Sequence, residues 1–240
     1  MCLLCRVSDY IIMFYYIFLH TFLDLGAKFL IVKLFVLGAP GSGKSTACRT
    51  IHTYISQSGR IKYSARLNDY DILREMFLAE RGITGRFQAT ERGGFIWVDL
   101  AVCDEALRVA NAKMNVWLAN ELEQWIMIEF SRDDYSHALQ QFDLSLVQDA
   151  YFLFIEAQED LCRERLRERV KHPKSRDDHF VSDDILDTYY KPAFKLNILD
   201  ISDQHGIEAQ RIRVIANNGS LTDFVREIQR FVDTILPPLA

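Results

Sequence analysis

The sequence lacks a surplus of basic residues. Its 240 residues include 28 Lys and Arg against 33 Asp and Glu, which gives a formal net charge of −5 at pH 7. Proteins dedicated to nucleic acids usually carry a basic surplus that meets the phosphates, so we expect no nucleic-acid partner. A small anionic substrate is still compatible with this charge, because a local cluster of arginines is enough to bind it.

A regular cysteine pattern is also missing. Cys48, Cys103 and Cys162 lie far apart in segments of helical character, and such scattered thiols are typical of buried, reduced cysteines. Cys2 and Cys5 form a single C-x-x-C with no second pair and no histidine partner nearby, so the pattern disfavours a zinc site there. The sequence contains no evident internal repeat or low-complexity tract.

The densest apolar run, YIIMFYYIFLHTFL at 10–23, is shorter than the ~20 residues of a membrane-spanning helix. It also lacks the basic start and the small-residue cleavage site of a secretory signal. Three interpretations stay open: a membrane-associating segment, an extra element packed on the domain, or upstream sequence included through a wrongly chosen start. We favour the third, because the organised pattern begins near Lys28. We therefore expect an apolar extension at 1–27 outside the core, a domain at 28–240, and a cytoplasmic protein with at most weak membrane association.

The rest of the chain alternates buried strands with amphipathic helices. The full sequence has 49% apolar and 25% charged residues, which is the composition of a globular protein. The alternation predicts an α/β fold, a three-layer α/β/α sandwich around a parallel five-stranded sheet. The expected strands are 29–37, 61–67, 125–132, 150–157 and 211–217. The expected helices are 43–58, 99–123, 159–170, one that begins near Ser182 as its cap, and 221–235. The segment 70–98 is mixed and contains short helical stretches.

A glycine-dense loop follows the first predicted strand and precedes the first predicted helix. The stretch GAPGSGKST, residues 38–46, fits a phosphate-binding loop. The glycines let the backbone curl so that successive N–H groups point at phosphate oxygens, and the following helix presents its positive end. Lys44 would reach the β- and γ-phosphates, and the Ser45 hydroxyl could bind Mg²⁺. The strand and helix on either side are the context in which this motif binds phosphate.

This loop resembles that of the P-loop nucleoside and nucleotide kinases, a group that includes adenylate kinase and related small-molecule kinases. The resemblance extends from about Lys28 to the end of the chain, and it implies a P-loop NTPase fold with a mobile lid. It also implies ATP and Mg²⁺ as cofactors. The residues that it assigns to nucleotide binding in the loop are Gly38, Gly41, Ser42, Gly43, Lys44, Ser45 and Thr46, with Lys44 also in a catalytic role.

The stretch IEFSR at the end of the third predicted strand is similar to the acidic-x-x-arginine motif of these kinases. The resemblance places Glu129 beside Lys44, as a Mg²⁺ ligand or as the base that accepts the proton of the acceptor hydroxyl. It places Arg132 toward the acceptor. The alternative is a Glu–Arg pair on the surface at a strand end.

The helix DLCRERLRERV resembles the segment that leads into the lid of these kinases. Arg165 and Arg169 are four residues apart and share one face of the helix. The resemblance implies that they neutralise the transferring phosphoryl group when a lid at 163–184 closes, and that Arg176 contacts the substrate. The alternative is a solvated face on which the arginines pair with Glu164 and Glu168.

Two further positions carry expected roles. The stretch VIANNGS resembles the turn that cradles adenine in several of these kinases, and the matching residues are Asn217, Asn218 and Gly219. By itself an Asn-Asn-Gly turn is only a turn. Asp69, at the end of the second predicted strand, occupies the usual place of a carboxylate that contacts the substrate. Alternatively, it caps a helix that starts near Tyr70.

These patterns favour an ATP-dependent phosphotransferase that acts on a small-molecule acceptor, with a nucleoside or nucleotide as one candidate. A GTPase-type switch should carry an N-K-x-D guanine reader, which is absent, and the D-x-x-G at 203–206 lies too far along the chain. A P-loop ATPase and a non-catalytic nucleotide-binding regulator are the alternatives. No pattern identifies the acceptor, which we expect to bind the segment 70–98, or the oligomeric state.

Overall fold

The computed structural model describes residues 31–90, 94–120, 125–171, 181–187, 191 and 198–236. All described residues belong to one compact unit, which spans Ile31–Ala240. The expected apolar extension at 1–27 lies outside the described residues. Within the described ranges, no helix combines the length and the apolar character that crossing a membrane requires.

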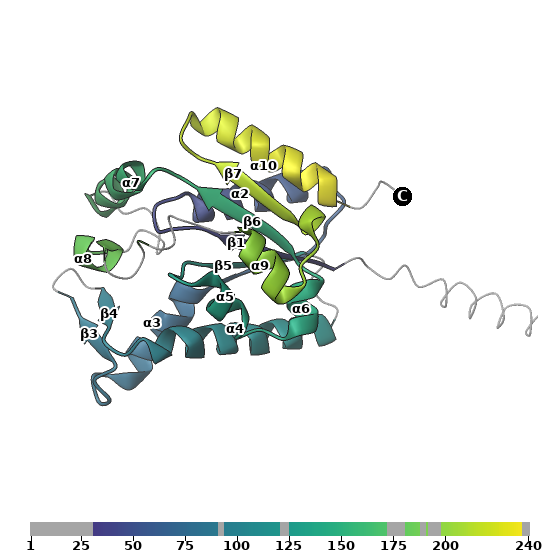
Figure 1. Ribbon diagram of the computed structural model, residues 1–240. Helices are drawn as coiled ribbons and strands as arrows, with labels where there is room; N and C mark the ends of the chain where they lie inside the picture. The colour runs from purple at the N-terminus through teal and green to yellow at the C-terminus, as the bar shows by residue number, and fades with distance from the viewer. Residues whose placement is uncertain are drawn as a thin grey trace, which may run out of the picture. The chain divides into compact units, whose positions relative to one another are not determined.

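A parallel sheet of five strands forms the middle layer, as the sequence predicts (Figure 1). Its strand order is β2-β5-β1-β6-β7, and every neighbouring pair runs parallel. Leu37 at the end of β1 aligns with Phe130 of β5 and with Phe154 of β6, so these strands end at the same edge. The strands are β1 (Val32–Leu37), β2 (Ser64–Asn68), β5 (Trp125–Phe130), β6 (Tyr151–Glu156) and β7 (Ile212–Ala216).

Two helices cover one face of this sheet. They are α2 (Lys44–Ser58) and α10 (Leu221–Ile235). Ile51 and Ile55 of α2 and Ile228 of α10 are fully buried against the sheet. The apolar residues recur at helical spacing, which gives each helix one buried stripe and one solvated face. Both helices have the bounds that the sequence predicts to within one residue.

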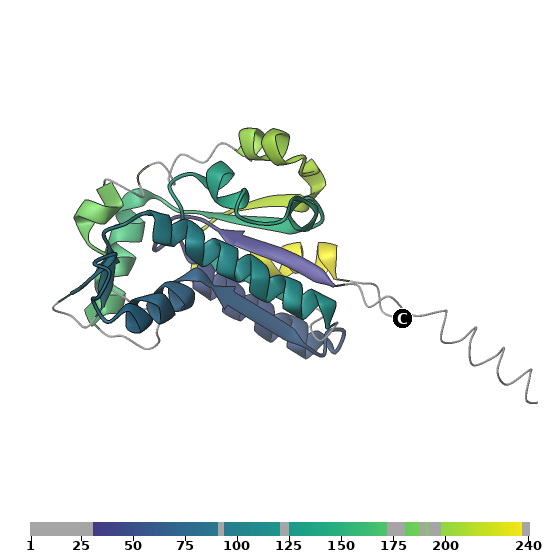
Figure 2. The same cartoon turned by 90° about the horizontal axis from the view of Figure 1, so that it is seen from below.

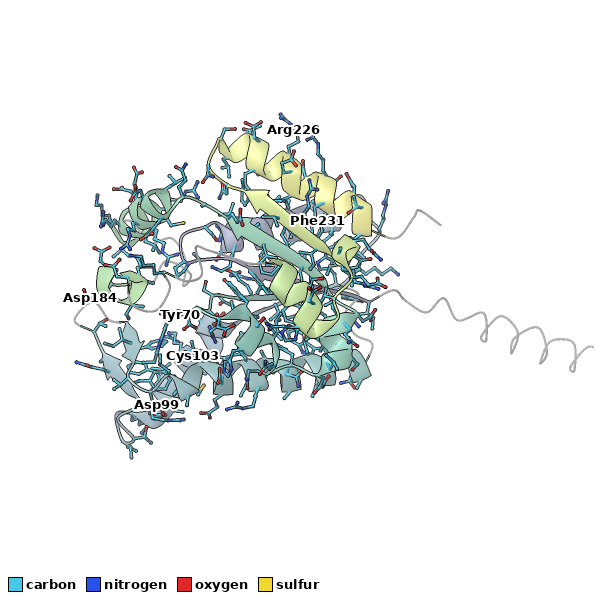
Figure 3. All side chains as sticks on the ribbon, in the orientation of Figure 1. Tyr70, Asp99, Cys103, Asp184, Arg226 and Phe231 are labelled. Carbon is cyan, nitrogen blue, oxygen red and sulfur yellow. The ribbon has the colours of Figure 1, made fainter. Side chains whose placement is uncertain are left out.

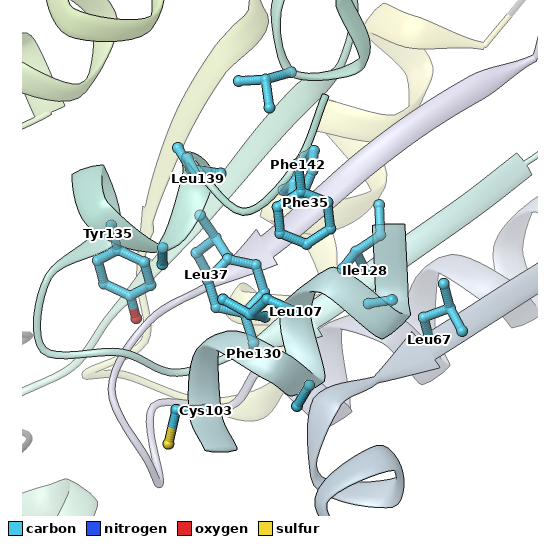
Figure 4. Packing of buried hydrophobic residues seen from close by; sticks show 14 of the residues in the cluster. Phe35, Leu37, Leu67, Cys103, Leu107, Ile128, Phe130, Tyr135, Leu139 and Phe142 are labelled. Carbon is cyan, nitrogen blue, oxygen red and sulfur yellow. The ribbon is translucent and has the colours of Figure 1, made fainter. Parts of the chain in front are cut away.

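A larger set of helices covers the opposite face, seen from below in Figure 2. Aromatic rings form the centre of this layer: Phe35 stacks on Phe152 with ring centroids 5.0 Å apart and meets Phe142 edge-on. Figure 4 shows Phe35 and Phe142 among the side chains that pack around Leu107 and Phe130. The helices are α3 (Asp69–Glu80), α4 (Ala101–Ala119), α5 (Tyr135–Leu139), α6 (Leu144–Gln148) and α9 (Ile198–His205).

The hairpin and two further helices lie at the end of the sheet where the strands finish (Figure 1). Two short antiparallel strands form a hairpin, β3 (Phe87–Ala89) and β4 (Phe95–Trp97). Helix α7 (Glu159–Lys171) follows β6, and α8 (Asp183–Ile185) begins after Ser182, whose side chain accepts a hydrogen bond from the Ile185 N–H as predicted. A 3-10 turn at Ala209–Arg211 precedes β7.

The structure differs from the sequence-based expectation in several elements. The hairpin β3–β4 and the short helices α5, α6 and α9 were not expected. The expected helix at 99–123 is α4, which covers 101–119, and the second strand starts at Ser64 rather than at Ile61. Cys48, Cys103 and Cys162 are buried and form no disulfide, as expected.

Candidate active site

The loop between β1 and α2 is closely packed, and Gly41 and Gly43 illustrate why it needs glycine. Gly41 has a φ of 79°, and a Cβ there would lie 2.5 Å from the carbonyl oxygen of Cys162. Gly43 has a φ of 113°, and its Cβ would lie 2.4 Å from the side-chain nitrogen of Asn217. L-residues rarely adopt such φ values. The loop is therefore a backbone cradle held against α7 on one side and the turn after β7 on the other.

Lys44 folds back over this cradle. Its ammonium donates hydrogen bonds to the carbonyl oxygens of Gly38 at 2.9 Å and Ala39 at 3.0 Å, and the residue is only 8% exposed. Burial lowers the pKa of Lys44, while the negative charges of Glu129 and Asp69 oppose this shift. An anionic phosphate beside the ammonium would favour the charged form further.

Ser45, Glu129 and Arg66 form a connected polar group beside the loop. The Ser45 hydroxyl donates to Glu129 Oε1 at 2.7 Å, and Arg66 donates through Nε to Glu129 Oε2 at 2.9 Å. A second guanidinium nitrogen of Arg66 lies 2.6 Å from the same oxygen. The Glu129 side chain is 5% exposed, so Arg66 neutralises a buried charge. Sequence reasoning missed Arg66; the one available signal was a cation inside a predicted strand.

Asp69 and Arg132 form a second ion pair at the ends of β2 and β5. The guanidinium of Arg132 also donates to the Ser131 carbonyl at 2.6 Å and to the Cys103 carbonyl at 2.9 Å. Burial raises the pKa of Asp69, and the charge of Arg132 offsets part of that rise. The suggestion that Asp69 caps α3 is wrong, because the Asn68 side chain accepts the hydrogen bond from the Tyr70 N–H.

Two residues that the sequence did not single out hold the first glycine of the loop. The Tyr135 hydroxyl accepts a hydrogen bond from the Gly38 N–H at 2.9 Å, and the Ser131 hydroxyl donates to the Gly38 carbonyl at 2.8 Å. Burial raises the pKa of Tyr135, so its phenol is neutral near pH 7. No pattern marks these residues, because each meets the loop only after the sheet has formed.

The arginines of α7 divide into two groups. Arg165 donates to the Asn217 carbonyl at 2.9 Å. Arg165 and Arg169 both line a cavity at the carboxyl ends of the strands. Arg163 pairs instead with Glu159, Asp183 and Asp187, and Arg167 pairs with Asp183. The helical spacing of Arg165 and Arg169 therefore brings both to the cavity, while Arg163 and Arg167 join α7 to α8. Arg176 lies outside the described residues.

The turn after β7 braces the loop. Asn217 is 7% exposed, and its side-chain amide donates to the Ser42 carbonyl at 2.7 Å. Asn218 accepts a hydrogen bond from the Gln158 N–H at 2.8 Å. Asn217, Asn218 and Gly219 are not among the described residues that line this cavity, so the expected adenine contact would lie beside it.

A cavity of about 310 Å³ opens at the carboxyl ends of the strands. Tyr70, which lines it, lies between Asp184 of α8 and Cys103 of α4 in the view of Figure 3. Arg132 is 3% exposed and is not among the described lining residues; it stands behind Asp69 rather than in the wall. The expected site residues that do line the cavity are Gly41, Gly43, Lys44, Ser45, Thr46, Asp69, Glu129, Arg165 and Arg169.

The residues present fit a magnesium nucleotide. Mg²⁺ usually keeps several waters and takes one or two carboxylates together with phosphate oxygens. Among the described residues, no group of three or more His, Cys, Asp and Glu side chains is placed to hold a metal alone. The adjoining oxygens of Ser45 and Glu129 suit a Mg²⁺ that is held by protein and phosphate oxygens together, and the backbone cradle with Lys44 suits the phosphates.

No family model and no curated protein matches the sequence, but solved structures match the fold. Kti12 of Chaetomium thermophilum, in complex with ADP-AlF3, aligns with 86% of this chain and 100% of its own chain, at 12% identity and a TM-score of 0.54. A candidate kinase of Chloroflexus aurantiacus J-10-fl aligns with 87% of this chain and 100% of its own chain, at 14% identity and a TM-score of 0.52. The chain therefore has the α/β fold of the P-loop kinases, which confirms the predicted fold.

Proposed function

We propose that this protein is an ATP-dependent phosphotransferase that moves the γ-phosphate of Mg·ATP to the hydroxyl of a small molecule, with a nucleoside or nucleotide as one candidate. The observation that carries the proposal is the continuity of the cavity. Lys44 and Ser45 line it at the loop, and Tyr70 and Trp97 line it on α3 and β4. The phosphate end of a nucleotide and an acceptor would therefore share one space, as transfer requires.

The two carboxylates of the site suit different tasks. Both oxygens of Glu129 are engaged, one by Ser45 and the other by Arg66, which fits a residue that orients a Mg²⁺ ligand set. Asp69 lines the cavity and has a raised pKa, which fits a general base. In this proposal Asp69 accepts the proton of the acceptor hydroxyl while the oxygen of that hydroxyl forms a bond to the γ-phosphorus. The bond from that phosphorus to the ADP oxygen breaks.

The cations of the site would stabilise the transferring group. The bound Mg²⁺ would supply charge neutralisation on the β- and γ-phosphate oxygens. Lys44, Arg165 and Arg169 line the same cavity and place three further positive charges around it. We also propose that Asn217, Asn218 and Gly219 border the adenine, and that α7 and α8 form part of a closing lid.

Cys48, Cys103 and Cys162 are buried and form no disulfide, which supports a reducing compartment, and we propose that the protein acts in the cytoplasm. A P-loop ATPase or a nucleotide-binding regulator is the alternative to a kinase. It predicts ATP turnover without an acceptor, or ATP binding without turnover.

A screen for ADP release across nucleosides, nucleotides, sugars and cofactor precursors tests the proposal. We expect at least one compound to raise ADP release above the rate with ATP alone, and Lys44→Met to abolish the increase. Arg49→Met is a matched control, since Arg49 also lines the cavity but is not part of the phosphate-loop motif. Turnover that no compound increases would contradict the kinase proposal and favour an ATPase.

A further inference from the structure

The wall of the cavity that faces away from the phosphate loop is apolar. Every described lining residue with a charged or amide side chain comes from α2, from the ends of β2 and β5, from the first position of α3, or from α7. The rest of α3, together with β4 and α8, contributes only apolar and aromatic side chains among the described residues. They include Tyr70, Leu73, Phe95, Ile96, Trp97 and Ile185.

Stacked rings hold this wall in place. Tyr70 stacks on Phe95 with centroids 5.4 Å apart and planes 11° from parallel, and Phe77 stacks on the same ring at 5.0 Å and 18°. Phe87 meets Phe95 edge-on at 5.6 Å. Phe95 is 7% exposed, so the hairpin and α3 share one aromatic core whose outer surface faces the cavity. A surface fixed in this way binds a rigid partner with little loss of side-chain entropy.

Trp97 connects this wall to the lid elements. It packs against the apolar pair Leu166 of α7 and Leu186, beside Ile185 of α8. Arg163 ties α7 to Asp183 and Asp187 on the same segment. The apolar wall therefore continues from the hairpin onto the segment that we propose as a lid, so a bound acceptor would have apolar surface on more than one side.

Such a wall discriminates between classes of alcohol. A polyol or sugar acid would place several hydroxyls against side chains that offer few hydrogen-bond partners, and an unmatched buried hydroxyl is costly. A flat ring would instead stack on aromatic side chains and leave them well packed. The volume also suits one ring, because an apolar cavity of about 150 Å³ holds benzene and this cavity, phosphate end included, is about 310 Å³.

We propose that the acceptor is an alcohol whose body is an aromatic or apolar ring system, packed against Phe95 and Trp97 with its hydroxyl toward Asp69, and that polyols and sugar acids are rejected. This inference rests on the proposed phosphotransfer, because it assigns the wall to the acceptor. The expected specificity therefore differs from that of a kinase in which polar side chains bind the hydroxyls of a sugar-like substrate.

Trp97 provides the probe. The chain has three tryptophans, of which Trp125 is fully buried and Trp117 lines a different groove. We would titrate the full chain with two panels of compounds in the absence of ATP and follow tryptophan fluorescence. One panel contains aromatic alcohols and nucleosides, and the other contains polyols and sugar acids. The same panels would then be assayed for ADP release. The variants are Trp97→Leu, Trp97→Phe and the control Trp117→Phe.

The aromatic panel should quench fluorescence in the wild type and in Trp117→Phe but not in Trp97→Phe, and it should support ADP release. Trp97→Leu should raise the acceptor KM by about tenfold or more, the scale of a lost aromatic contact, and leave the ATP KM nearly unchanged. Trp97→Phe should keep most of the affinity. Ile96→Ser, on the same wall, should weaken the aromatic panel in the same direction if Trp97→Leu fails to fold.

Transfer to polyols with an acceptor KM that Trp97→Leu does not change would overturn the inference and leave the kinase proposal standing. Quenching by the aromatic panel without any transfer would support the assignment of the wall and contradict the kinase proposal. Quenching of Trp97 by ADP that excludes the aromatic panel would give the wall to the adenine and overturn the inference.

Discussion

Removing the cation that neutralises Glu129 should destabilise the protein measurably. Arg66→Met keeps the apolar stem of the side chain and deletes the guanidinium that lies 2.6 Å and 2.9 Å from Glu129 Oε2. Deleting one partner of a fully buried pair costs about 3–5 kcal/mol. The side chain of Arg66 is 26% exposed and that of Glu129 is 5% exposed. Water can therefore reach the space that the guanidinium leaves, and we expect the free energy of unfolding to fall by about 1–3 kcal/mol.

Denaturation in urea and by heat would measure this loss. For a chain of this size 1 kcal/mol corresponds to about 2–4 °C, so a loss of about 2 kcal/mol should lower Tm by about 4–8 °C. A double-mutant cycle with Glu129→Gln isolates the pair, because the double variant leaves no unmatched charge. We expect the two changes to be non-additive by about 1–2 kcal/mol.

The control is Arg213→Met. Arg213 pairs with Glu227 at 3.6 Å on the surface, where the two side chains are 54% and 36% exposed, and such pairs contribute about 0–1 kcal/mol. Equal losses in Arg66→Met and Arg213→Met, with additive effects in the cycle, would refute the reasoning that Arg66 holds a buried carboxylate in place.

The remaining predictions concern the loop and the proposed base. Lys44→Ala should weaken ATP binding or abolish transfer while the fold persists, as measured by nucleotide titration and circular dichroism; unchanged binding and turnover would contradict the role. Burial raises the pKa of Asp69 above its ordinary 3.8, and the carboxylate form is the base. Activity should therefore fall as the pH drops through that raised pKa. Asp69→Asn should remove this acid-side fall from the pH–activity profile together with most of the activity; an unchanged acid-side fall would exclude Asp69 as the base. Asn217→Ala leaves the Ser42 carbonyl without its 2.7 Å donor and should cost about 1–3 kcal/mol, read by urea denaturation, whereas Asn218→Ala at the exposed neighbour should cost less. Tyr135→Phe, which removes the acceptor for the Gly38 N–H, should raise the ATP KM and leave the acceptor KM unchanged; a change in the acceptor KM alone would count against it.

The sheet and its long helices could be predicted because each carries a complete local pattern. The stretch from Val32 to Leu37 is apolar throughout, as a strand buried on both faces must be, and α10 repeats its apolar residues at helical spacing. The loop at 38–46 combines a glycine pattern with a strand and a helix, so its conformation follows from the sequence alone. These features depend on residues that are neighbours along the chain.

The elements that escaped prediction depend on partners far along the chain. Helices α5 and α6 have five residues each, too few to show a period, and the packing of Leu139 and Leu146 in the core holds them. The hairpin has three-residue strands and is held by the rings of Phe77 and Phe95. Local periodicity cannot show such contacts.

The same limit applies to the site. The spacing of Arg165 and Arg169 showed that they share a face, but only the strand order shows that β2 lies next to β5. That order brings Asp69 to Arg132 and Arg66 to Glu129. The resemblance to the P-loop kinases implied that Arg132 faces the acceptor. In the structure Arg132 is buried behind Asp69, because its guanidinium pairs with that carboxylate and donates to two backbone carbonyls.

The measurement that tests the account most directly is the stoichiometry of transfer. The wild type would be incubated with Mg·ATP labelled in the γ-phosphate, with and without an aromatic alcohol from the panel, and the label would be followed into acceptor and inorganic phosphate. Our account predicts one phosphorylated acceptor for each ADP formed, and almost no ADP without the acceptor or in Lys44→Met. Release of ADP and inorganic phosphate in equal amounts, at a rate that no acceptor changes, would contradict it.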